Sequence, residues 1–211
     1  MKKGFKTKSS LWRKLNFLKN KYFYIGLFVF ILSIVLNLLA SWYLLEKYPG
    51  KLFVLYDLIL NNIPYYSVAF LSDLLVVFSL VLFIVYVVHK KKEDEISYYL
   101  FLLGFFYIIR AVFIVVTPLG NPVESYNRIF NGSLFDIGSY PSGHIGTCFL
   151  MLLLSKGTYK YLISFLLIGL VGTILFSRSH YSIDVFSAFI FVYAVYSFSS
   201  NYLKKYFVKK I

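Results

Sequence analysis

Charged side chains are scarce in this chain, and acidic ones are the scarcest. Asp and Glu supply 9 of the 211 residues, Lys and Arg supply 22, and charged residues as a whole make up 15%. A soluble domain of this size carries about a quarter of its residues as charged ones. Cys148 is the only cysteine, which excludes an internal disulfide and a cysteine-based zinc site. The composition therefore excludes an ordinary soluble enzyme or a disulfide-stapled secreted module.

Long apolar runs take the place of the missing charges. Hydrophobic residues reach 59%, aromatic residues reach 21%, and the mean hydropathy is +0.72. A bilayer core about 30 Å thick is crossed by roughly 20 apolar residues in a helix, and a single strand leaves its backbone unsatisfied there. The sequence predicts an all-α, polytopic bundle of six transmembrane helices, with the fourth short for a full span. The predicted spans are Phe23–Leu45, Ser67–Val88, Tyr98–Thr117, Ser142–Leu154, Tyr159–Ser177 and His180–Tyr202.

A net charge of +13 could indicate that the protein binds nucleic acid. The basic residues, however, flank the apolar spans, as in membrane proteins. Seventeen of the 22 lie in the two tails and in the loops on one side, four lie on the other side, and Arg110 lies within the third span. Such an excess marks the cytoplasmic side, where basic residues meet anionic lipid. We expect both termini to be cytoplasmic, no nucleic-acid partner, and a first span that is retained rather than cleaved as a signal peptide.

This interpretation divides the chain into a basic cytoplasmic tail at 1–22, a membrane domain at 23–203 and a second basic tail at 204–211. The connection Pro118–Pro141 is the longest between spans and is predicted to face outward, where it presents the glycosylation sequon Asn131-Gly132-Ser133. The membrane is expected to be the plasma membrane in a prokaryote and an endomembrane in a eukaryote.

The first cluster of chemical interest is Tyr140-Pro141-Ser142-Gly143-His144, at the predicted start of the fourth span. Proline and serine ahead of an apolar run are typical of a helix start, with Ser142 as a candidate cap. A helix amino terminus binds anions through unpaired N–H groups, and Gly143 allows an oxyanion to approach the backbone. His144 adds a side chain that titrates near neutral pH. Taken alone, the cluster is equally compatible with a capped helix that happens to carry an interfacial histidine.

The second cluster, Ser177 to Val185, holds His180 and Asp184 at a spacing of four residues. On a helix this spacing places both side chains on one face, where the carboxylate holds one ring nitrogen and leaves the other to attack. Arg178 adds a planar donor suited to phosphate. The simpler interpretation is a His–Asp pair that only satisfies itself.

The predicted topology brings the two clusters to the same outer face. The fourth and sixth spans both begin there, whereas His89 belongs to the cytoplasmic basic loop. Two histidines, an arginine and two helix amino termini at one level favour phosphoryl transfer, which needs mainly positioning and charge neutralisation. Asp73 and Arg110 lie at similar depths in the second and third spans, so we also expect them to pair or Arg110 to reach the substrate.

These residues resemble the type 2 phosphatidic acid phosphatase superfamily and its sphingomyelin synthase-related branch. Residues 141–144 match the PSGH motif of the phosphatases, and residues 180–185 are similar to the HYTxDV motif of the synthases. A further likeness to the synthases is Arg110 followed by Ile114, Val116, Thr117 and Leu119 at the end of the third span. The resemblance implies a phosphohistidine on His180, oriented by Asp184, with His144 protonating the leaving group. It implies neither a metal nor an organic cofactor.

The resemblance leaves three functions open. The KxxxxxxRP motif of the phosphatases is missing from the outer side, since the spacing of Lys6 and Arg13 falls in the cytoplasmic tail and lacks the proline. Arg178 lies two residues before His180, where typical phosphatases have six, which favours the synthases. The intact PSGH proline favours the phosphatases. We expect transfer of a phospho-headgroup from a phospholipid to a lipid alcohol. Hydrolysis of a lipid phosphate or pyrophosphate is the alternative, and a catalytically silent lipid-binding protein is the third. The expected substrate-binding residues are Arg178, Ser142, Gly143 and Arg110.

Overall fold

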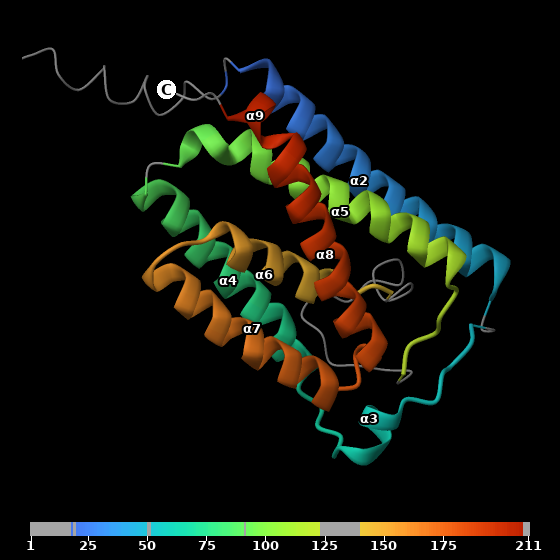
Figure 1. Ribbon diagram of the computed structural model, residues 1–211. Helices are drawn as coiled ribbons and strands as arrows, with labels where there is room; N and C mark the ends of the chain where they lie inside the picture. Colours follow the sequence, from blue (N-terminus) through green and yellow to red (C-terminus); the bar gives the residue numbers. More distant parts are fainter. Residues whose placement is uncertain (1–17, 19, 50–51, 91, 123–139, 209–211) are drawn as a thin grey trace, which may run out of the picture.

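The computed structural model describes residues 18, 20–49, 52–90, 92–122 and 140–208, and helices dominate them. The predicted tail up to residue 17, most of the Pro118–Pro141 connection with its sequon, and residues 209–211 lie outside the described residues. One isolated bridge pairs Phe53 with Leu119. The helices are α2 (Lys21–Lys47), α3 (Leu58–Asn62), α4 (Ala69–His89), α5 (Ile96–Val116), α6 (Gly143–Leu154), α7 (Thr158–Phe176), α8 (Ser182–Tyr202) and α9 (Lys204–Phe207), with a 3₁₀ turn at Glu93–Glu95 before α5 (Figure 1).

Five of the six predicted spans are helices long and apolar enough to cross a bilayer: α2, α4, α5, α7 and α8. The fourth prediction, Ser142–Leu154, forms α6, which has 12 residues. At about 1.5 Å per residue, α6 extends about 18 Å. It is therefore shorter than the hydrocarbon core, as its sequence indicated.

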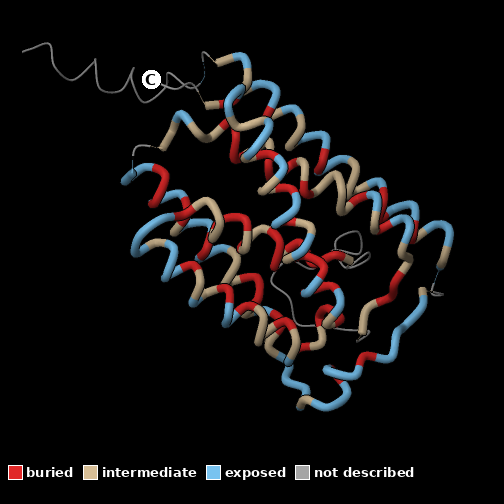
Figure 2. Tube along the Cα trace, viewed as in Figure 1, coloured by how far each residue is buried: buried red, intermediate tan, exposed pale blue. Residues whose placement is uncertain are grey.

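The helices form two pairs with a central layer between them. α2 packs along α5, α4 packs along α7, and α6 lies against α4, α7 and α8 (Figure 1). Buried residues gather where the helices face one another, and exposed residues cover the outward sides of α2, α4 and α7 (Figure 2). The main core includes Leu102, Phe106, Ile145, Cys148, Leu170 and Val192. The short helix α6 is thus the centre of the bundle.

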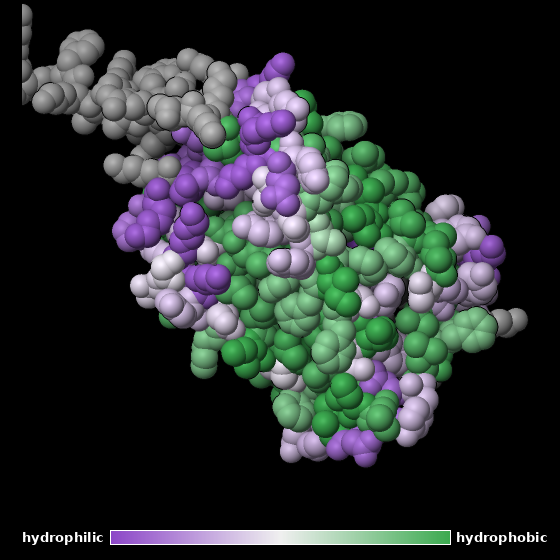
Figure 3. Space-filling model, viewed as in Figure 1, coloured by the Kyte–Doolittle hydropathy of each residue, from purple (hydrophilic) through white to green (hydrophobic). Residues whose placement is uncertain are grey.

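The surface is apolar to a degree that water does not favour. Phe165 is 77% exposed, Ile190 is 67% exposed and Phe28 is 65% exposed. In Figure 3 such residues form a broad belt, with hydrophilic residues gathered at the two ends of the molecule. A contiguous apolar surface of this kind is typical of contact with lipid. The apolar helices and this belt indicate an integral membrane protein.

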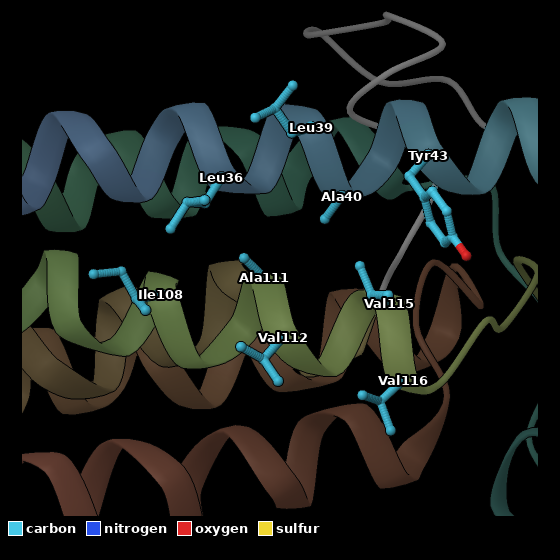
Figure 4. A pocket seen from close by; sticks show the side chains of 9 residues that line it. All are labelled: Leu36, Leu39, Ala40, Tyr43, Ile108, Ala111, Val112, Val115 and Val116. Carbon is cyan, nitrogen blue, oxygen red and sulfur yellow. The ribbon is translucent and has the colours of Figure 1, made fainter.

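The pairing of α2 with α5 depends on close backbone approach. A Cβ atom added to Gly104 would lie 2.7 Å from the backbone nitrogen of Phe30, so only glycine fits there. Small residues at helix contacts are common in membranes for this reason. Toward the end of α5 the two helices leave an apolar groove of about 460 Å³ between Leu36 and Ala40 on one side and Ala111 and Val115 on the other (Figure 4).

Candidate active site

The His180–Asp184 pair forms in the turn that starts α8. Nδ1 of His180 lies 3.2 Å from Oδ2 of Asp184, and the same oxygen accepts the backbone N–H of Tyr181 at 3.0 Å. His180 is 3% exposed and Asp184 is fully buried. The two side chains meet as the spacing predicted, but for a different reason. Because α8 begins at Ser182, His180 precedes the helix and Asp184 reaches back to it as part of the capping turn.

The turn at Pro141–Gly143 starts α6 and touches the start of α8. The hydroxyl of Ser142 accepts the backbone N–H of Ile145, as a helix cap does. The backbone N–H of Ser142 donates to the carbonyl of Asp184 at 3.2 Å. A Cβ on Gly143 would lie 3.1 Å from the hydroxyl of Tyr107. The two motifs, about 40 residues apart in sequence, are therefore joined by a direct backbone hydrogen bond.

The two histidines face each other across this junction. Their ring centroids are 6.0 Å apart, and the ring planes are inclined by 66°. His144 is partly exposed, with 26% of its side chain accessible, whereas His180 is buried. Nε2 of His144 lies 3.1 Å from Oδ1 of Asp73, a residue of α4 that is itself 3% exposed. Each histidine thus has a carboxylate partner.

Arg110 contacts the first motif from α5. Its Nε donates to the carbonyl of Pro141 at 2.9 Å, and one terminal nitrogen donates to Oδ1 of Asn37 at 2.6 Å. The guanidinium also lies over the ring of Tyr107, 5.9 Å from its centroid. A direct pair between Arg110 and Asp73 stays a prediction, and the carboxylate of Asp73 contacts His144 on α6.

Arg178 lies at the junction of α7 and α8 with a φ of 51°, an uncommon value for a residue other than glycine. Its guanidinium donates to the carbonyl of Leu60 at 3.0 Å and lies over Tyr65 at 5.9 Å. These contacts hold the segment around α3. Of the two arginines predicted to bind substrate, Arg110 touches the histidine motif directly, and Arg178 contacts the neighbouring segment.

Asp57 joins α3 to α8 through two helix amino termini. One carboxylate oxygen accepts the N–H groups of Ile59 and Leu60, and the other accepts that of Ser182 at 2.6 Å. Partial burial acts to raise the pKa of this carboxyl, but the hydrogen bonds from Leu60, Ser182 and Ile59 outweigh burial and lower the pKa. Leu55 adds its N–H to the hydroxyl of Tyr181 at 3.0 Å. The segment before α3 therefore contacts the start of α8 twice, through Asp57 at Ser182 and through Leu55 at Tyr181.

Four of these contributors lay outside the predicted site, namely Asn37, Tyr107, Asp57 and Asp73, and only Asp73 had been singled out in the sequence, as a partner for Arg110. Asn37 stands in the apolar run of the first span, where a polar side chain is costly and usually has a partner. That signal was available from the sequence. Tyr107 and Asp57 gave none, since tyrosine is common throughout this chain and Asp57 lies in a connection.

The arrangement suits chemistry at a group that carries negative oxygen atoms. Two imidazoles face each other, one is oriented by a buried carboxylate, and Arg110 contributes a positive charge beside them. Within the described part of the chain, no group of three or more His, Cys, Asp or Glu side chains is arranged to hold a metal ion.

A comparison of the chain with models of known protein families found no match, and a comparison with curated proteins found no relative.

Proposed function

We propose that this protein is a membrane-embedded lipid phosphotransferase that moves a phospho-headgroup through a phosphohistidine on His180. The observation that carries the proposal is the convergence of the two motifs. The rings of His144 and His180 are 6.0 Å apart, and Nδ1 of His180 is 3.2 Å from the Asp184 carboxylate. The resemblance of these motifs to the type 2 phosphatidic acid phosphatase superfamily supports the same chemistry.

The roles follow from which atoms are held. The carboxylate of Asp184 accepts a hydrogen bond from Nδ1–H of His180, so the lone pair on Nε2 is the one that attacks phosphorus. The bond from phosphorus to the leaving oxygen breaks, and His144 supplies the proton that this oxygen needs. Arg110 and the amino terminus of α6, which begins at Gly143, balance the charge on the remaining phosphate oxygens. In the second step the oxygen of an acceptor hydroxyl attacks phosphorus, its proton passes to His144, and the bond from phosphorus to Nε2 breaks, which regenerates His180.

Burial of the nucleophile supports transfer to a lipid rather than to water. His180 is 3% exposed, and a transferase must exclude water while its phosphoenzyme waits for the acceptor. We propose a phospholipid or lipid phosphate as donor and a lipid alcohol as acceptor. Hydrolysis of a lipid phosphate or pyrophosphate shares the first step and differs only in the molecule that attacks the phosphohistidine.

In this proposal the membrane is crossed six times. α6 completes the six spans although it is short, because α4, α7 and α8 pack against it and surrounding protein can replace lipid around a short segment. Both termini face the cytoplasm, as the 17 basic residues on that side predict. The starts of α4, α6 and α8 then face outward, and the site lies on the exoplasmic side of the plasma membrane of a prokaryote or an endomembrane of a eukaryote.

The test is to trap the phosphoenzyme. Purified protein is mixed with phospholipids labelled at phosphorus, quenched in alkali, which preserves phosphohistidine, and analysed by mass spectrometry of both peptides and lipids. We expect the labelled phospho-headgroup on the peptide that contains His180 and none in His180→Ala. Labelled lipid products should form on addition of ceramide or diacylglycerol, with or without a metal chelator.

The control is His89→Ala, which removes the remaining histidine, an exposed residue that contacts Tyr159. It should leave labelling unchanged. Release of free phosphate that is independent of every lipid alcohol supplied would make the protein a phosphatase. Absence of both phosphohistidine and product with all donors would leave a catalytically silent lipid-binding protein.

A further inference from the structure

Asp73 is built into the site by α4, a helix that carries neither histidine motif. Its carboxylate is 3% exposed, and Oδ1 lies 3.1 Å from Nε2 of His144. A carboxylate inside an apolar helix bundle is costly unless it is paired and hydrogen-bonded. The contact with His144 is therefore one that the buried carboxylate of Asp73 needs.

The two His–Asp pairs use opposite ring nitrogens. Asp184 binds Nδ1 of His180, which leaves Nε2 as its second nitrogen, whereas Asp73 binds Nε2 of His144 and leaves Nδ1. The carboxylates also come from different places, since Asp184 is local to its histidine and Asp73 crosses from α4 to α6. The arrangement distinguishes two imidazoles that would otherwise be chemically alike.

We propose that Asp73 is a positioning residue that keeps a proton on Nε2 of His144, so that Nδ1 of His144 exchanges protons with the oxygen atoms that leave and attack phosphorus. A carboxylate beside an imidazole stabilises the protonated ring and fixes which nitrogen carries the shared hydrogen. The inference deepens the proposed function and rests on it, because the proton matters only if phosphorus is transferred to His180.

The proton balance over one cycle is closed. Nε2 of His180 forms a bond to phosphorus, the bond from phosphorus to the donor oxygen breaks, and that oxygen takes the proton from Nδ1 of His144. The acceptor hydroxyl then gives its proton to Nδ1 of His144 while its oxygen attacks phosphorus and the bond to His180 breaks. Asp73 holds the hydrogen on Nε2 throughout and neither gains nor loses it.

Leaving groups separate this role from a purely structural one. An alkoxide leaves phosphorus only with a proton, so its departure depends on His144 and hence on Asp73. A nitrophenolate leaves without one. Loss of the Asp73 charge should therefore slow phosphorylation of His180 by a lipid donor and spare phosphorylation by a nitrophenyl donor. Damage to the fold would slow both.

The experiment compares Asp73→Asn with the wild-type protein on two matched pairs of donors. One pair is dihexanoyl phosphatidylcholine and p-nitrophenyl phosphorylcholine, and the other is dihexanoyl phosphatidic acid and p-nitrophenyl phosphate. Within each pair the transferred group is the same and only the leaving group differs. Asparagine keeps an oxygen that accepts from Nε2 but removes the charge. Rapid quenching measures formation of phosphohistidine in a single turnover.

We expect Asp73→Asn to slow phosphorylation by the alkyl donor by about 10²-fold or more, the range of general acid catalysis, and to change the aryl donor by less than about threefold. Asp73→Glu, which restores a carboxylate, should recover part of the alkyl rate. In His144→Ala the further change Asp73→Asn should cost nothing, because the two residues act in one path and their effects are not additive.

The matched control is Ser79→Ala, which removes a buried hydroxyl on α4 that lies 3.3 Å from Sγ of Cys148 on α6. It should leave both rates unchanged. Equal slowing of the alkyl and aryl donors by Asp73→Asn, or full additivity with His144→Ala, would overturn the proposal. Should the asparagine variant not fold, Asp73→Ser is judged by the same ratio. A protein that forms no phosphohistidine with any donor contradicts the proposed function itself.

Discussion

Arg110 is the residue whose chemistry depends most on being arginine. Its Nε donates to the carbonyl of Pro141 and one terminal nitrogen donates to Asn37, two of the five N–H donors that the planar guanidinium carries. A lysine has the same charge but cannot hold this geometry, because its ammonium is a single point on a flexible stem. The guanidinium therefore both fixes the turn before α6 and supplies charge beside the histidines.

We predict that Arg110→Lys raises the KM for the phosphodonor by about tenfold, which corresponds to about 1.4 kcal/mol of lost binding. Initial rates over a range of donor concentrations measure the effect. Lys47→Arg, a conservative change at an exposed residue on α2 that contacts Tyr43, is the control and should leave KM unchanged. An unaltered KM in Arg110→Lys would limit this side chain to a structural role.

At the scale of elements, the start of α8 is held by the segment that contains α3. Asp57 accepts hydrogen bonds from both helix starts, and Arg178 donates to the carbonyl of Leu60. Because Ser182 lies between His180 and Asp184, loss of these contacts loosens the turn that carries both side chains. The segment that contains α3 thus contributes to the rigidity of the candidate nucleophile.

We predict that Asp57→Asn destabilises the folded protein by about 1 kcal/mol, the usual value of a helix cap. The pKa of Asp57 is lowered in the folded state from 3.8, so its stabilising effect is present above that value and is lost as pH falls through the lower folded value. Thermal unfolding in detergent at several pH values measures this. The difference between wild type and variant should be constant near neutrality and vanish only in strong acid. A difference that disappears between pH 5 and 7 would contradict the assignment to Asp57.

The sequence predicted the long helices well and gave little information on how they contact one another. The fifth prediction, Tyr159–Ser177, differs from α7 (Thr158–Phe176) by one residue at each end, because length and apolar composition suffice to find a span. The contact between Asp73 and His144 was not predicted, because the sequence offered only Arg110 as a partner for this carboxylate. Helices that are apolar all round give no periodic signal for their rotation. The small helix α3 was also missed, because five residues in a connection leave no pattern.

At the scale of the whole molecule, the proposed orientation divides the connections into two sets that reagents distinguish. Tyr56 is 81% exposed beside α3, and Lys90 is exposed at the opposite end of α4. Cys148, the native thiol, is fully buried. Labelling of an introduced cysteine by a thiol reagent should therefore stand out, because Cys148 itself reacts little.

We predict that Tyr56→Cys reacts with a membrane-impermeant thiol reagent in intact cells, and that Lys90→Cys reacts only after lysis. The reason is the excess of basic residues on the side of Lys90, which the inner membrane surface retains. Unsubstituted protein, with Cys148 alone, is the control. The opposite labelling pattern would show that the bundle has the inverted orientation and that the site faces the cytoplasm.

The distribution of the site over four helices sets the order in which it arises during synthesis. Asp73 enters the bilayer with α4, and Arg110 with α5, ahead of α6 and α8, the later helices that bring in His144 and His180. Insertion of an ionised side chain through the translocon has an apparent free energy of about 2.5 to 3.5 kcal/mol at the centre of a span and less near its ends. The valines, leucines and phenylalanines around Asp73 give the most apolar stretch of α4 a mean hydropathy of 2.7. This apolar character offsets the cost of the carboxylate, so α4 can insert before His144 is in place. Asp73 and Arg110 are therefore inserted into the membrane before the later helices pack against them.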